Sequence, residues 1–115
     1  MNLRMTKVAP TLVVEKIEPT LEFFIESLGF KKEMDVPGEH GLIFAMVVHG
    51  AIEIHMQTKE SVTKDIPYLK ECSIPSSSFL YIDVEDVKSL YDQLKNSDIV
   101  VPLQKTFYGA THFFV

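Results

Sequence analysis

Three polar side chains that can bind a ligand occupy every second position of one predicted strand. They are Glu53, His55 and Gln57, and the residues between them are apolar. Successive side chains of a strand point to opposite faces of its sheet, so these three share one face and the apolar residues share the other. A carboxylate and an imidazole two positions apart can also contribute two ligands to a metal ion. The alternative is that all three face water from a one-sided sheet.

Other familiar chemical arrangements are missing from the sequence. We find no Ser/His/Asp nucleophile arrangement, no phosphate-binding glycine loop and no Cys/His zinc spacing. Cys72 is the single cysteine, so it cannot form an internal disulfide, and the neighbouring Glu71 does not favour a thiolate. We therefore expect an inert thiol at Cys72, and the sequence designates no catalytic residue.

Composition and charge exclude several classes of function. The chain has 115 residues, of which 46% are hydrophobic, which suits a single domain with one core. Its net charge of -5 comes without a concentrated basic stripe, so nucleic acid is not an expected partner. Residues 1–7 are not followed by the apolar run of a signal peptide, and no apolar run approaches membrane-spanning length. We expect a cytoplasmic protein with no membrane partner.

A weak internal repeat indicates two copies of one supersecondary unit. Apolar positions recur at an offset of about 70 residues, because Leu12, Val14, Ile17, Leu21 and Phe24 correspond to Ile82, Val84, Val87, Tyr91 and Leu94. In each copy, a short alternating stretch precedes an amphipathic helix. Folds with such pseudo-symmetry often place a ligand site between their halves.

The local patterns predict the elements of the first copy. Residues 8–14 form a strand, and apolar spacing from Ile17 to Leu28 predicts a helix with Pro19 in its first turn and Gly29 at its C-terminal cap. A weaker strand over residues 31–36 ends at a Pro-Gly turn. Residues 42–49 and 51–57 form a hairpin around Gly50.

The second copy follows a connector. Residues 59–78 contain two prolines and a run of serines, with one helical turn around residues 68–70. A strand over residues 79–84 then leads into a helix that begins at the N-cap Asp86, carries an apolar stripe from Val87 to Leu94 and stops at residues 96–97. Residues 99–103 and 112–115 are the last predicted strands.

These motifs together resemble a known superfamily. Residues 12–24, followed by Ser27-Leu28-Gly29-Phe30, resemble the opening module of the glyoxalase, bleomycin-resistance and extradiol-dioxygenase group, the vicinal oxygen chelate superfamily. Residues 51–57 resemble the strand that closes this module, and residues 81–87 with Tyr108-Gly109 resemble the second module. The resemblance spans nearly the whole chain and implies an α+β fold of paired βαβββ modules around a small-molecule cavity. Residues 1–115 would be one domain, with module one at about 6–58, a connector at about 59–78 and an incomplete module two at about 79–115.

The resemblance also implies positions for a divalent metal. Its ligands would lie on the first and fourth strands of each module, leaving open positions for two substrate oxygens. The first-strand position falls on Ala9 and its counterpart on Phe79, and neither side chain has a lone pair to donate. Glu53 matches the fourth-strand position, and its counterpart lies beyond Val115. We therefore expect no obligatory metal or other cofactor, with Glu53 and His55 as metal ligands only if the ligand set is altered.

The cavity-facing positions of the repeat define the predicted ligand-binding residues. These are Thr11, Glu53, His55, Gln57, Phe79, Tyr81 and Asp83, with Ala9 and Val13 beside them. Carboxylates mixed with aromatic faces suit a planar, aromatic or cationic ligand. Phe79 can equally be an ordinary core residue.

Three functions are compatible with this resemblance. The leading hypothesis is a homodimer that binds a small organic molecule without an obligatory metal, similar to the bleomycin-resistance branch. The first alternative is a metal-dependent lyase, isomerase or dioxygenase that uses Glu53 and His55. The second alternative is a non-catalytic regulatory or interaction module that keeps the fold as a scaffold.

The repeat predicts one strand that the sequence does not contain. The counterpart of residues 51–57 would begin near residue 120, after Val115, which suggests a truncated sequence. The second sheet is therefore expected to end in an open hydrogen-bonding edge near residues 112–115. Either a second subunit covers this edge, as we expect, or the second module is frayed.

Overall fold

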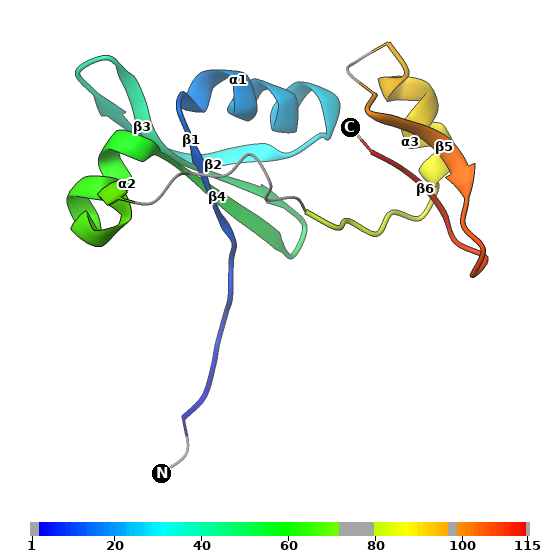
Figure 1. The fold of residues 1–115 in the computed structure, drawn as a ribbon, viewed down its shortest axis with the longest axis horizontal. Coiled ribbons are helices and arrows are strands. Elements are labelled where there is room, and N and C mark those ends of the chain that lie inside the picture. Colours follow the sequence, from blue (N-terminus) through cyan, green and yellow to red (C-terminus); the bar gives the residue numbers. More distant parts are fainter. Residues whose placement is uncertain (1–2, 72–79, 97–98, 115) are drawn as a thin grey trace. The chain divides into compact units, whose positions relative to one another are not determined.

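The first part of the chain folds as the predicted βαβββ module. In the computed structural model, residues 3–71, 80–96 and 99–114 are described, and the chain divides into two units, Met1–Ser76 and Ser77–Val115. Unit 1 (Met1–Ser76) contains β1 (Thr11–Val14), α1 (Ile17–Glu22), its π-helical continuation η1 (Phe23–Ser27), β2 (Lys31–Gly38), β3 (Gly41–His49) and β4 (Ile52–Thr58). The strands form one sheet in the order β1-β4-β3-β2 (Figure 1). β1 runs parallel to β4, and the other neighbours are antiparallel.

The core of unit 1 lies between α1 and one face of this sheet. α1 packs against β3 and β4, and its buried residues Ile17 and Leu21 lie one turn apart. On β4, Ile54 is 3% exposed and Met56 is 0% exposed. The predicted alternation of apolar and polar residues along this strand is therefore confirmed.

A glycine ends the α1–η1 helix, as predicted. Gly29 has a φ of 75°, a left-handed conformation that other residues adopt at a cost. The reversal lets the backbone N–H of Phe30 donate to the carbonyl of Phe24 at 3.0 Å. The rings of Phe24 and Phe30 then pack edge to face, with centroids 5.2 Å apart.

The first strand is shorter than predicted. β1 begins at Thr11 rather than at Val8, directly after Pro10. Proline has no N–H to donate to a ladder, although its carbonyl still accepts a bond of 3.0 Å from the N–H of His55. β2 instead continues two residues beyond its predicted end, to Gly38.

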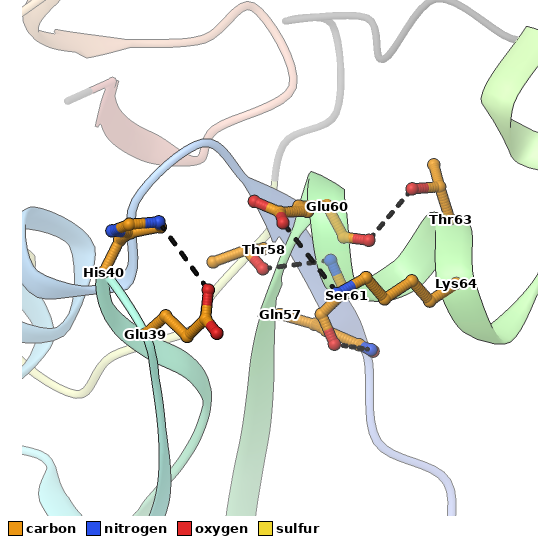
Figure 2. Close-up of polar contacts among 8 residues, drawn as sticks. All are labelled: Glu39, His40, Gln57, Thr58, Glu60, Ser61, Thr63 and Lys64. Carbon is orange, nitrogen blue, oxygen red and sulfur yellow. Dashed lines mark hydrogen bonds and ion pairs between the residues drawn. The ribbon is translucent and has the colours of Figure 1, made fainter.

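The predicted connector contains a helix that the prediction missed. α2 (Lys59–Asp65) starts at the N-cap Thr58, whose Oγ1 accepts a bond from the N–H of Ser61 at 3.2 Å (Figure 2). Glu60 in its first turn and Lys64 in its last turn both suit the helix dipole. The predicted helical turn around residues 68–70 is present in the 3₁₀ helix η2 (Pro67–Glu71). Cys72 lies outside the described residues.

The described residues of unit 2 (Ser77–Val115) form one helix and one hairpin. α3 (Val87–Leu94) begins at the predicted N-cap Asp86, whose carboxylate accepts a bond from the N–H of Ser89 at 3.0 Å. β5 (Val101–Lys105) and β6 (Thr111–Phe114) pair antiparallel, close to the predicted last strands. Leu94 of α3 is 2% exposed. No helix in the described part of the chain is long and apolar enough to cross a membrane.

The predicted strand at the start of the second copy is wrong over residues 80–84. These residues form no strand, and Tyr81 is 79% exposed. The rest of that prediction, Phe79, lies outside the described residues. In unit 1, the first strand β1 pairs with the fourth strand β4. Among the described residues, no strand pairs with residues 80–84 in this way.

Candidate functional site

The predicted polar residues of β4 lie on the sheet face that points away from α1. The strand register places Val48 opposite Glu53, Met46 opposite His55 and Phe44 opposite Gln57. Directly paired residues of neighbouring strands share a face of the sheet. The register therefore identifies the residues of the other three strands that lie on the same face as Glu53, His55 and Gln57. We call it the distal face, and it comprises Thr11, Val13, Lys31, Met34, Val36, Phe44, Met46, Val48, Glu53, His55 and Gln57.

A hydrogen-bonded charge cluster lies at one end of the distal face. The Oε2 atom of Glu53 is 2.7 Å from the Nζ of Lys7 and 2.6 Å from the Nε2 of His55. The Glu53 side chain is 16% exposed and that of His55 is 22% exposed, whereas that of Lys7 is 59% exposed. The carboxylate is therefore covered on most sides and neutralised by an exposed lysine.

This cluster makes the stability of the protein depend on pH. Hydrogen bonds from Lys7 and then His55 hold the pKa of the Glu53 carboxyl below its ordinary value. The unfolded chain therefore takes up a proton more readily, so Glu53 contributes stability above about pH 4 that is lost as the pH falls through the folded-state pKa. We expect Glu53→Gln to reduce the fall in melting temperature between about pH 5 and pH 3, measured by thermal unfolding in a pH series.

A matched substitution separates this effect from the general loss of a carboxylate. Glu22→Gln, at an exposed position of α1, should leave the pH dependence close to that of the unchanged protein. Some dependence will persist in Glu53→Gln, because hydrogen bonds to Leu42 and Ser89 also lower the pKa of Glu18 and of Asp86. An identical slope in both variants would show that the Glu53 cluster does not contribute.

An apolar wall adjoins the charge cluster. Phe44, Met46 and Val48 on β3 are half-buried, and Met34 on β2 is 43% exposed. The rings of Phe44 and His55 pack edge to face with centroids 5.5 Å apart, which joins the wall to the cluster. Methionine side chains adapt to the shape of a ligand because they are unbranched and polarisable. The surface therefore combines an adaptable apolar area with a few fixed polar atoms.

Gln57 is turned away from this cluster. Its Nε2 donates to the Oγ of Ser61 at 2.9 Å (Figure 2). The same Nε2 donates to the Oδ2 of Asp65 at 2.9 Å, so α2 holds the side chain. Gln57 shares the distal face with Glu53 and His55 but takes part in a separate network. Because the helix was not predicted, neither was this restraint.

The structure brings some of the predicted site residues together. Thr11 is exposed on the distal face directly opposite His55. Tyr81 and Asp83 belong to unit 2, where both are exposed and no strand holds them. Phe79 lies outside the described residues.

Sequence reasoning missed Lys7 and the wall residues Phe44 and Met46. Lys7 has the same parity as Thr11 and Val13, so continuing the alternation of the first strand towards the N-terminus could have found it. The two wall residues alternate with the buried Ala45 and Val47, which is the same signal on β3.

The described side chains around Glu53 do not supply the set of ligands that a divalent metal needs. Ala9, the position where the resemblance places a metal ligand, has only a methyl side chain and lies before β1 begins. Divalent metals need several oxygen or nitrogen ligands, and the bonding Oε2 of Glu53 already contacts Lys7 and His55. In the described residues, no three His, Cys, Asp or Glu side chains gather into a metal-binding group.

Comparison with known families agrees with this architecture. The family model of the glyoxalase/bleomycin resistance protein/dioxygenase superfamily matches residues 6–115. The chain belongs to this superfamily. No curated protein sequence matches it significantly.

Solved structures share the fold at low sequence identity. A glyoxalase/bleomycin resistance protein/dioxygenase from Nocardioides is 15% identical, with a TM-score of 0.71 over 97% of this chain and 78% of that one. The bleomycin-binding protein of Streptomyces verticillus, complexed with copper(II)-bleomycin, is 18% identical, with a TM-score of 0.60 over 97% and 87%. A glyoxalase-related enzyme from Fulvimarina pelagi is 16% identical, with a TM-score of 0.65 over 93% and 77%. The three show that one fold accommodates both binding proteins and enzymes.

Proposed function

We propose that this superfamily member binds a small organic molecule with an aromatic or other apolar body against the distal face of unit 1. The observation that carries the proposal is the half-buried wall of Phe44, Met46 and Val48 beside the polar pair Glu53 and His55. Small-molecule sites typically combine an apolar lining with a few oriented polar groups. The wall supplies contact area and the polar pair supplies orientation.

The donor set favours binding without a resident metal over the metalloenzyme alternative. One carboxylate that already accepts two hydrogen bonds leaves a divalent ion without the ligands that it needs. The likeness to a bleomycin-binding protein supports a small organic ligand. As part of the proposal, the protein acts as a homodimer. Among the described residues of unit 2, β5 pairs only with β6, so the outer edge of each strand can pair with a strand of another chain.

A fluorescent probe tests this function directly. The sequence contains no tryptophan, so the fluorescence of 1-naphthylmethanol can be followed without an indole background. We expect saturable binding to the unchanged protein and at least a tenfold weaker affinity in Met46→Glu, because a charge on the wall must be desolvated when the ring docks. Circular dichroism checks that the variant is folded.

An exposed aromatic residue outside the distal face supplies the matched control. Tyr68 in η2 is 78% exposed, and Tyr68→Glu should bind the probe like the unchanged protein. The proposal fails if the unchanged protein does not bind the naphthyl probe saturably, or if Met46→Glu binds it equally well.

A further inference from the structure

We infer that Lys7 is an internal occupant of a cation-binding subsite formed by Glu53 and His55, and that a primary ammonium group on a ligand displaces it. The inference rests on the proposed function, because the rest of the ligand would lie on the apolar wall of the distal face. It also assigns a chemical class to the ligand, namely an amine attached to an aromatic or aliphatic body.

The subsite has the features that a bound ammonium requires. The Glu53 carboxylate is 16% exposed, and a covered carboxylate needs a cation or hydrogen-bond donors to offset its desolvation. His55 supports the same oxygen from the side, at 2.6 Å, and the ring of Phe44 packs against the imidazole. Lys7 already demonstrates the fit, because its ammonium nitrogen is 2.7 Å from the carboxylate.

Few interactions hold Lys7 in the subsite. Its side chain is 59% exposed, and ion pairs with an exposed partner contribute little to stability. The segment around it has no secondary structure, with Met5 88% exposed and Val8 94% exposed. β1 starts only at Thr11, so moving Lys7 away disrupts no strand pairing. Displacement therefore costs little packing.

A ligand that carries an ammonium group can make contacts that the Lys7 side chain does not make. A ligand that carries an aromatic body can pair with Glu53 and cover Phe44 and Met46 at the same time, whereas Lys7 makes the ion pair alone. Lys7 therefore competes with cationic ligands and has no such effect on neutral ones. Removing its charge should convert the distal face into a selective amine site.

Two probes with the same naphthyl ring, one ending in an ammonium group and one in a hydroxyl group, test this competition. The cationic 1-naphthylmethylamine and the neutral 1-naphthylmethanol are titrated against the full chain by fluorescence. Lys7→Met should bind the amine about fivefold more tightly, the factor expected for loss of an exposed competing ion pair, and should bind the alcohol unchanged. Lys7→Arg keeps the competing charge and should bind both probes like the unchanged protein.

Two further variants complete the design. The double variant Lys7→Met, Glu53→Gln should lose the tighter binding of the amine that Lys7→Met alone shows. Lys64→Met removes another lysine that lies near a glutamate, at 3.9 Å from Glu60, and should alter neither affinity.

The outcomes separate this inference from the proposed function. If 1-naphthylmethanol binds and Met46→Glu weakens it, but Lys7→Met leaves the amine affinity unchanged, the inference is wrong and the proposed function stands. If neither probe binds any variant, both are wrong. A gain for the amine that persists in the combined Lys7→Met and Glu53→Gln protein would also overturn the role of Glu53.

Discussion

Replacing Ile54 with alanine is expected to lower the free energy of unfolding by about 2–5 kcal/mol, because the substitution leaves a cavity in a packed core. Ile54 is 3% exposed and pairs across the sheet with Val47, which is 0% exposed. Both strands pack against α1. The cavity that the lost methyl and methylene groups leave is therefore closed to water. Chemical denaturation followed by far-ultraviolet circular dichroism measures the change.

The same strand offers a control with the same residue type on the same face. Ile52 is 45% exposed at the start of β4, two residues before Ile54. Ile52→Ala should therefore cost about 1 kcal/mol or less, since it removes little buried area. Equal losses in the two variants would contradict the placement of the core beneath α1.

Hydrogen exchange should separate the sheet of unit 1 from residues 80–84 by about a thousandfold or more in amide exchange rate. The amides of Val47 and Ile54 lie in central strands with a hydrogen-bonded neighbour on each side. Ile82 and Val84 are 42% and 41% exposed and belong to no strand. Their amides should exchange at close to unprotected rates, as measured by exchange with mass spectrometry or NMR.

Concentration dependence gives this experiment its control. If a strand of a second copy pairs with residues 80–84, protection of Ile82 and Val84 will rise with protein concentration, and sedimentation will show a dimer at the same concentrations. Strong protection of these amides in a monomer would contradict the description of residues 80–84 as lacking a strand.

Local patterns in the sequence predicted much of the fold. The period-two alternation along β4 identified both of its faces, and the left-handed Gly29 ended its helix as predicted. Asp86 caps α3 through the N–H of Ser89. Each of these features depends on residues that are close in the chain, so their chemistry can be read without knowing the fold.

The candidate site was predicted only in part for the same reason. Alternation placed Glu53 and His55 on one face but could not identify the groups that meet them there. Lys7 lies 46 residues from Glu53 in sequence, and only the parallel pairing of β1 with β4 brings the two together. Gln57 likewise shares its face with Glu53 yet bonds to Ser61 and Asp65 of a helix in the predicted connector.

The two copies of the repeat show what a sequence determines and what tertiary structure decides. Leu12 and Val14 in the first copy and Ile82 and Val84 in the second carry the same apolar signal, but only the first pair lies in a strand. A strand requires hydrogen bonds from a neighbouring strand as well as a suitable pattern of side chains. β4 supplies those bonds to β1 in unit 1, whereas no strand among the described residues pairs with residues 80–84. The sequence by itself determined which residues of a strand share a face of the sheet. Tertiary pairing decided which segments became strands and which lysine pairs with Glu53.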